Sequence, residues 1–265
     1  MNALVRLGQR LPKRWRLWLL RSPFAPTLRR WLNRYCSESQ RLVIVDLAPP
    51  LEGHRMKLDW LINKAYVFGV YEPDVVEAMH KHVQAGMVAV DCGAHIGYHT
   101  LLLAKLVGAS GKVYAFEPLP ENFAVLCENI AINGYRNVAA ENKAVAEQTG
   151  ILRLARGRWE PNDSDPLTSV SRLSEDGDLE VAAVALDDYF VDKRVDFIKV
   201  DVEGAEERVL KGARNLLSRY RPALIVSIHG FSEDHPALHL LRELDYCCRP
   251  LSEWGAERHV LCWCE

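Results

Sequence analysis

The stretch from Met87 to Pro118 constrains the fold of this chain more than any other. It opens with a short apolar run, residues 88–90, which is typical of a buried parallel strand and breaks into a glycine-bearing turn, DCGAHIG, at residues 91–97. Apolar residues then follow with helical spacing, and a second apolar strand, residues 113–116, ends in Glu117. The pattern predicts a strand–helix–strand unit of a parallel α/β sheet.

Such a unit binds a nucleotide-like ligand beyond the carboxyl ends of its strands. Glu117 follows Gly97 by 20 positions (117 − 97), which places it to accept hydrogen bonds from ribose hydroxyls. This spacing alone leaves the cofactor class open. A dinucleotide loop has the pattern G-x-G-x-x-G, and here His95 stands where the middle glycine is expected. A nicotinamide-dependent oxidoreductase is therefore the disfavoured alternative. The pattern D-x-G-x-x-x-G instead resembles the first motif of class I S-adenosylmethionine-dependent methyltransferases.

The charge of the chain is unevenly distributed. Its 265 residues suit one α/β domain with an appendage, and the net charge is −2. Residues 1–41 contain ten Lys or Arg and one acid, 10 − 1 = +9, whereas the remainder holds 23 basic and 34 acidic residues, 23 − 34 = −11. The two parts are expected to meet different partners. Nucleic acid is disfavoured because the acidic domain would repel phosphates.

The basic segment, residues 1–41, is predicted to form an amphipathic helical arm. One helical face would carry apolar residues at intervals of three and four, namely Leu4, Leu7, Leu11, Trp15 and Trp18. Pro12 indicates a break, so that two short helices are the alternative. The arm either lies on an anionic membrane surface or packs on its own domain or a second subunit. The apolar run at residues 17–20 is too short for a membrane span or a secretory signal. Together with the odd number of cysteines, this favours a cytoplasmic protein, and the membrane alternative would make it peripheral on the inner membrane face.

Residues 42–86 are expected to form a β/α segment before the core, and residues 87–265 the main domain. In the first segment the predicted elements are strands at 42–45 and 65–70 and a helix at 75–83. In the domain the predicted elements are a helix at 121–132 and strands at 138–145, 181–186, 195–200, 225–229, 246–251 and 259–264, the last two as an antiparallel pair. Residues 150–180 are interpreted as a solvated loop, with substrate contact as the alternative.

A second informative stretch is VDFIKVDVEGAE, residues 195–206. An apolar strand again delivers an acid, Asp201, to the carboxyl end of the sheet. Glu203 and Glu206 open the next helix, and helix capping is the expected role of Glu206. Asp201, Glu203 and His229 could together supply ligands for a divalent metal, but this is a lesser possibility and no metal is assigned.

These ordered motifs resemble the FkbM-type family of S-adenosylmethionine-dependent methyltransferases. The resemblance covers residues 67–230 and includes Tyr71-Glu72-Pro73, Phe116-Glu117-Pro118 and the A-L-D-D-Y strand end. It implies a class I methyltransferase fold, a Rossmann-like, doubly wound α/β architecture whose seven-stranded sheet is mostly parallel with one antiparallel strand. Two positions depart from the family pattern: His95 replaces a frequent Asn, and Ser227 replaces a frequent acid.

The resemblance also implies an activity and a site. Members transfer methyl groups to hydroxyl oxygens of sugars, glycolipids or secondary metabolites. The residues expected to bind S-adenosyl-L-methionine are Asp91, Gly93, Ala94, His95, Gly97, Glu117, Pro118, Ala144 and Asp201. The residues expected to bind the acceptor are Tyr71, Glu72 and Glu203. A non-catalytic, membrane-associated scaffold with this fold is a further alternative, disfavoured because the motif residues are in place.

Methylation of a hydroxyl requires a group that takes up its proton. His229 ends the fifth strand on the same edge as Asp201, so His229 is the first candidate for the base and Asp201 the second. Four of the seven cysteines lie at residues 247–264. Their spacing lacks C-x-x-C pairs, so they are interpreted as buried strand cysteines rather than zinc ligands.

Overall fold

The computed structural model describes residues 11–12, 14–15, 42–59, 63–155, 172–173, 176–229, 235–254 and 257–264. The predicted arm, residues 1–41, therefore lies almost wholly outside the described residues, as does most of the predicted loop at 150–180. Among the helices of the described ranges, none is both long enough and apolar enough to cross a membrane.

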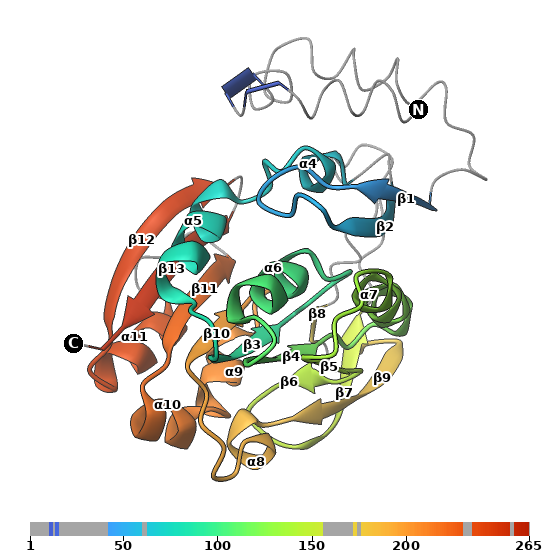
Figure 1. Cartoon of the computed structure of the whole chain (residues 1–265). Helices are drawn as coiled ribbons and strands as arrows, with labels where there is room; N and C mark the ends of the chain where they lie inside the picture. Colours follow the sequence, from blue (N-terminus) through green and yellow to red (C-terminus); the bar gives the residue numbers. More distant parts are fainter. Residues whose placement is uncertain are drawn as a thin grey trace.

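The centre of the molecule is a seven-stranded sheet (Figure 1). Its order is β12-β13-β11-β10-β3-β4-β5, formed by β3 (Val88–Cys92), β4 (Lys112–Phe116), β5 (Val138–Glu141), β10 (Phe197–Val200), β11 (Ala223–His229), β12 (Cys247–Trp254) and β13 (Glu257–Trp263). The pairs from β11 to β5 are parallel, and β13 runs antiparallel to both of its neighbours. The prediction of a mostly parallel sheet with one antiparallel strand is confirmed.

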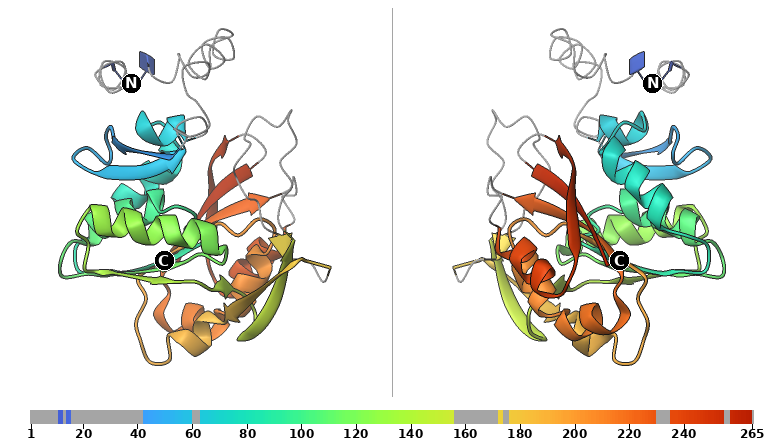
Figure 2. Two further views of the ribbon diagram at one scale, coloured as in Figure 1. Left: turned by 90° about the vertical axis from the view of Figure 1, so that its right-hand side faces the viewer. Right: turned by 90° about the vertical axis from the view of Figure 1, so that its left-hand side faces the viewer.

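Helices cover both faces of this sheet (Figure 2). One face packs against α5 (Pro73–His82) and α6 (Tyr98–Val107), with α7 (Pro120–Ile132) beside them. The other packs against α8 (Leu186–Tyr189), α9 (Glu206–Lys211), α10 (Arg214–Tyr220) and α11 (Pro236–Glu243). Consecutive strand residues alternate between the two cores, as Ala89 and Val90 do, because side chains of a strand point to opposite faces. Both faces are apolar, which is why the parallel strands have continuous hydrophobic sequences.

Residues 42–86 share the hydrophobic core of the domain rather than forming a separate one. The strand β1 (Leu42–Asp46) pairs antiparallel with β2 (Arg55–Asp59), and the hairpin is tied to α7 by Asn129. The Asn129 amide oxygen accepts from the backbone N–H of Lys57 at 2.6 Å, and its nitrogen donates to the Lys57 carbonyl at 3.0 Å. The division of the chain at residue 86 stays a prediction.

One element of this segment was predicted wrongly. The strand expected at 65–70 is a single helical turn, α4 (Lys64–Val67), and β2 was not predicted. The aromatic and β-branched residues of AYVFGV favour a strand, but tertiary packing decides the conformation of so short a segment. Gly69, with φ +59°, ends the turn where a Cβ would lie 1.8 Å from the Pro49 carbonyl oxygen.

A second, four-stranded sheet was only partly predicted. Its order is β6-β9-β7-β8, formed by β6 (Ala144–Val145), β9 (Leu179–Val184), β7 (Gly150–Ala155) and β8 (Arg172–Leu173). The strand predicted at 138–145 is in fact two strands in different sheets, β5 and β6. Residues 150–155, interpreted as loop, form β7, whose largely exposed side chains, including Ile151 at 73%, hide the strand pattern. A strand predicted at 181–186 corresponds to β9.

Candidate active site

The turn between β3 and α6 brings the backbone of two parallel strands into contact. Gly93 has φ +83°, and a Cβ on it would lie 1.8 Å from the carbonyl oxygen of Asp201, at the end of the neighbouring strand β10. Gly97, with φ +98°, caps α6, and a Cβ there would lie 2.7 Å from Leu126 Cδ1. Both positions favour glycine because their backbone is left-handed, and Gly93 also needs the absence of a side chain because the atom it would meet belongs to the backbone.

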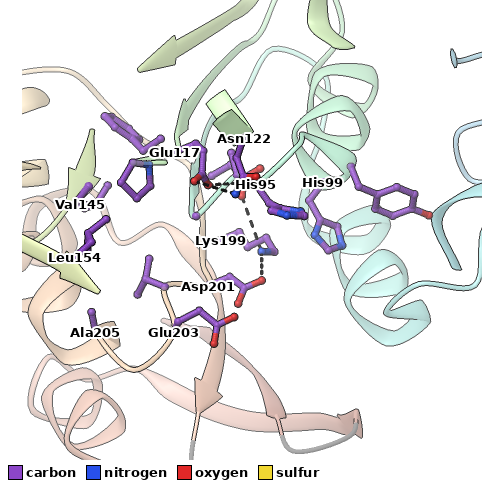
Figure 3. A pocket seen from close by; sticks show the side chains of 18 of the residues that line it. His95, His99, Glu117, Asn122, Val145, Leu154, Lys199, Asp201, Glu203 and Ala205 are labelled. Carbon is purple, nitrogen blue, oxygen red and sulfur yellow. Dashed lines mark hydrogen bonds and ion pairs between the residues drawn. The ribbon is translucent and has the colours of Figure 1, made fainter. Parts of the chain in front are cut away.

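This turn forms part of a pocket at the carboxyl edge of the sheet (Figure 3). The pocket is lined by Tyr66, Tyr71, Asp91, Gly93, Ala94, His95, Tyr98, His99, Phe116, Glu117, Pro118, Asn122, Ala144, Val145, Leu154, Lys199, Asp201, Val202, Glu203 and Ala205. The lining includes every residue expected to bind the cofactor except Gly97. Of the expected acceptor residues it includes Tyr71 and Glu203 but not Glu72, and of the candidate bases Asp201 but not His229.

Glu117, the predicted ribose acid, lies at the end of β4 and is almost fully buried. Its carboxylate accepts hydrogen bonds from the backbone N–H of His95 at 2.8 Å and of Leu119 at 3.0 Å, and from the Asn122 amide at 3.4 Å. Burial raises the pKa of Glu117 to about 7, against the opposing effect of these hydrogen bonds. The carboxylate is thus joined to the glycine turn, and both face the same pocket (Figure 3).

An apolar wall borders the Glu117 side of the pocket. Ala144 and Val145 come from β6, Leu154 comes from β7 of the second sheet, and Phe116 ends β4. A flat heteroaromatic ring is stabilised by such surroundings through burial of apolar area. Leu154 was not predicted as a site residue, since the sequence around it was interpreted as a loop.

A buried ion pair forms the floor of the pocket. The Lys199 ammonium donates to Asp201 Oδ2 at 2.7 Å and lies 4.0 Å from Asp91 Oδ1, and Thr100 Oγ1 donates to Asp91 Oδ2 at 2.6 Å. Burial disfavours the charge of Lys199, but Asp201 and Asp91 outweigh it and raise the Lys199 pKa. Burial alone would raise the pKa of Asp201. The positive charge of Lys199 and its hydrogen bond have the larger effect and lower the pKa of Asp201 to about 2. The sequence-based interpretation overlooked Lys199, although a lysine inside the otherwise apolar strand FIKV is a signal of a buried partner.

His229 lies among carboxylates at the end of β11. Its Nδ1 is 2.6 Å from Glu206 Oε1, and its Nε2 is 3.3 Å from Glu203 Oε2 and 3.9 Å from Asp201 Oδ1. Glu206, the first residue of α9, also accepts from the Gly204 backbone N–H at 2.9 Å, so its carboxylate joins His229 to the loop that precedes the helix. In the part of the chain that the structure describes, no group of three or more His, Cys, Asp or Glu side chains is arranged to hold a metal ion.

His95, the histidine of the glycine turn, has a backbone φ of 49° and lines the pocket. Burial lowers its pKa to about 4, so its imidazole is neutral at neutral pH. Ser227, which departs from the family's frequent acid, is fully buried in β11 opposite His259 of β13.

Comparisons with known proteins agree with this geometry. A family model described as "Methyltransferase FkbM domain" matches residues 91–248. The hexuronic acid methyltransferase AglP of Haloferax volcanii is 28% identical over 177 residues, which is 65% of this chain and 68% of that protein. Methyltransferase 1 of Beauveria bassiana is 29% identical over 142 residues, 46% of this chain and 57% of that protein.

The fold is likewise that of a solved relative. The structure of methyltransferase FkbM from Methylobacillus flagellatus matches with a TM-score of 0.50 and 22% sequence identity, covering 71% of this chain and 50% of that chain. The family model spans more than half of the residues, and it begins at the acid that opens the glycine turn. This chain therefore belongs to the FkbM family of S-adenosylmethionine-dependent methyltransferases.

Proposed function

We propose that this methyltransferase transfers a methyl group to a hydroxyl oxygen of a sugar, a glycolipid or a secondary metabolite. The observation that carries the proposal is the composition of the pocket beyond the glycine turn, where Tyr71, His99 and Glu203 surround the Lys199–Asp201 ion pair. Such a wall offers several donors and acceptors of hydrogen bonds to a hydroxylated molecule. Tyr66 and Tyr98, whose rings stack at 4.7 Å between centroids, add an apolar surface for a sugar ring.

In this proposal the chain holds the cofactor with the residues around Glu117. The Glu117 carboxylate would bind the ribose hydroxyls, Ala144 and Val145 would contact adenine, and the turn from Gly93 to Gly97 would approach the methionine part. S-adenosylmethionine supplies a methyl carbon bonded to a positively charged sulfur. Much of the rate of such a transfer comes from holding the acceptor oxygen in line with the methyl group.

The acceptor hydroxyl must lose its proton as its oxygen attacks. His229 and Asp201 stay the predictions made from the sequence. Asp201 is a weak base in this setting, since Lys199 lowers its pKa to about 2. Its negative charge fits better the role of accepting a hydrogen bond that orients the acceptor.

The acceptor class is tested with purified protein and S-adenosylmethionine, by measuring release of S-adenosylhomocysteine. Glucuronic acid and its methyl glycoside are the first acceptors to try, because one relative is a hexuronic acid methyltransferase, and glucose is the matched neutral control. We expect at least one sugar to raise the rate about tenfold or more above the acceptor-free rate. Mild alkali distinguishes the products, since it cleaves a methyl ester and leaves a methyl ether intact.

Binding measurements separate the alternatives. Calorimetry that shows binding of NAD but not of S-adenosylhomocysteine would restore the oxidoreductase interpretation. Binding of S-adenosylhomocysteine without turnover of any sugar, lipid-linked sugar or hydroxylated metabolite would favour a non-catalytic scaffold.

We also propose that the basic segment, residues 1–41, recruits the enzyme to an anionic membrane surface. Its ten Lys or Arg residues and its tryptophans support this, because cationic, amphipathic segments bind at the interface of such membranes. In a flotation assay, the full chain should float with vesicles containing phosphatidylglycerol and not with neutral vesicles. Equal flotation of a chain that starts at residue 36 would contradict the proposal.

A further inference from the structure

A second imidazole besides that of His95 lines the pocket. His99, the second residue of α6, lines the pocket and is 6% exposed. Its Nε2 lies 3.5 Å from Glu72 Oε2. Among the described residues, none forms a hydrogen bond with His99 Nδ1. Figure 3 shows the ring beside the Lys199–Asp201 pair, on the side of the pocket away from Leu154. His229, by contrast, is not part of the lining.

Behind His99 lies a chain of alternating carboxylates and imidazoles. Glu72, at the N-terminus of α5, is 1% exposed, and its Oε2 lies 3.8 Å from His259 Nε2 as well as near His99. His259, fully buried on β13, faces Asp74 Oδ2 through Nδ1 at 3.2 Å. The order Asp74, His259, Glu72, His99 thus leads to the pocket from Asp74, whose side chain is 14% exposed, through the buried His259 and Glu72. The Asp74–His259 contact is a hydrogen bond, whereas Glu72 lies within ion-pair distance of both imidazoles without a hydrogen bond to either. A carboxylate so placed can orient an imidazole, as in other acid–base sites.

The protonation states suit this arrangement. Burial, and then the positive charge of Lys199, lower the pKa of His99 well below its usual value, so that its ring is neutral and able to accept a proton. Burial and the charge of Asp201 raise the pKa of Glu72 to about 7, although Lys199 and His259 act in the opposite direction. Burial would lower the pKa of His259, but Asp74 and Glu72 raise it instead.

We propose that His99 is a catalytic residue whose Nδ1 accepts the proton of the acceptor hydroxyl, and that Glu72 is a positioning residue that orients the ring through Nε2–H. This rests on the proposed function. The electron pair of the O–H bond stays on oxygen, a lone pair of that oxygen forms the new bond to the methyl carbon, and the pair of the C–S bond goes to sulfur. The proton goes to Nδ1, and the resulting imidazolium charge is stabilised by Glu72. The 3.5 Å separation is of the kind that shortens in catalytic pairs when reactants bind.

The geometry is tested without any acceptor by nitrogen-15 NMR of the histidine rings in the protein saturated with S-adenosylhomocysteine. We expect the resonances lost in His99→Gln to belong to a neutral ring protonated on Nε2 at neutral pH. In Glu72→Gln these resonances should shift, whereas in the control His239→Gln, which changes an exposed residue of α11, they should not. A His99 ring that is charged, or protonated on Nδ1, would overturn the inference whatever the acceptor proves to be.

Kinetics with glucuronic acid as the acceptor probe give the second test. His99→Gln should lower kcat about 100-fold or more, while KM and the Kd for S-adenosylhomocysteine change less than about threefold. His229→Gln should lower kcat far less. The inference is overturned if His99→Gln keeps more than half of kcat or if it abolishes cofactor binding. If His99→Gln does not fold, His99→Asn replaces it in the same measurement. If the wild-type protein shows no turnover of glucuronic acid, that result contradicts the proposed acceptor and leaves the NMR result standing.

Discussion

Replacing Gly93 with alanine is expected to abolish binding of S-adenosylhomocysteine and to lower the free energy of unfolding by about 3 kcal/mol or more. The added Cβ would need a left-handed backbone at φ +83° and would lie 1.8 Å from the Asp201 carbonyl oxygen. A backbone atom at the end of a buried strand cannot move aside as a flexible side chain can. Urea denaturation measures the stability of the variant, and titration calorimetry measures its affinity.

Gly134 provides a matched control for this experiment. It also has a positive φ, +69°, but a Cβ there meets nothing within 4 Å. Gly134→Ala should therefore show the cost of the backbone conformation alone, about 1 kcal/mol, with cofactor affinity unchanged. Equal losses of stability in the two variants would mean that the contact between the turn and β10 is not as close as described.

Replacing Lys199 with methionine is expected to be the most destabilising change of a charged side chain, about 3–5 kcal/mol at neutral pH. Lys199 is 1% exposed and offsets the charges of Asp201 at 2.7 Å and Asp91 at 4.0 Å. Without it, two carboxylates remain in the core with no cation. Lys81→Met is the control, since the exposed Lys81–Glu77 pair should contribute less than about 0.5 kcal/mol.

The loss of stability caused by Lys199→Met is expected to depend on pH. With Lys199 present, the pKa of Asp201 is about 2, below the unfolded value of 3.8, so Asp201 contributes stability above pH 3.8 that is lost as the pH falls toward 2. Without Lys199, burial raises the pKa of both carboxyls, and their ionisation then destabilises the fold as the pH rises. The loss caused by Lys199→Met should therefore shrink between pH 7 and pH 4.

A double variant separates charge from packing. Adding Asp201→Asn to Lys199→Met removes one of the uncompensated charges, so it should recover part of the lost stability at neutral pH. A loss that is the same at every pH and is not reduced in the double variant would show that Lys199 acts through its packing.

The sheet could be predicted because its signals are local and repeated. Each core strand is a short apolar run followed by an acid or a glycine, as at Asp91, Glu117 and Asp201, and the order of such units fixes a parallel sheet. Most of the residues predicted to bind the cofactor lie together in the pocket for the same reason. They sit at or just after strand ends, and parallel strands end at one edge.

The proximity of His99, Glu72 and His259 could not be predicted in the same way. His99 and Glu72 lie 27 positions apart (99 − 72), and His259 is still more distant in the chain, so nothing in the local pattern indicates that they meet. A histidine inside an apolar helix and a glutamate before a proline each have ordinary explanations on their own. Their proximity depends on how α5, α6 and β13 pack, which is a tertiary property.

Leu154 could not be predicted as a site residue for a different reason. The strand that carries it exposes most of its side chains and pairs only within the small second sheet, so its hydrophobic pattern is weak. The residue becomes recognisable as part of the site only when the second sheet is placed beside the pocket.

The second sheet also determines how this enzyme can be re-engineered. The apolar wall, which is proposed to contact adenine, includes Ala144, Val145 and Leu154, from β6 and β7. The residues Tyr66, Tyr71 and His99 belong to segments at least 45 positions earlier (144 − 99). Widening the wall at Leu154 could therefore admit donor analogues with a larger base while the opposite end of the pocket keeps its shape. A donor of that kind that also carries an isotopically labelled methyl group would label the products of this one methyltransferase among all others in a cell extract.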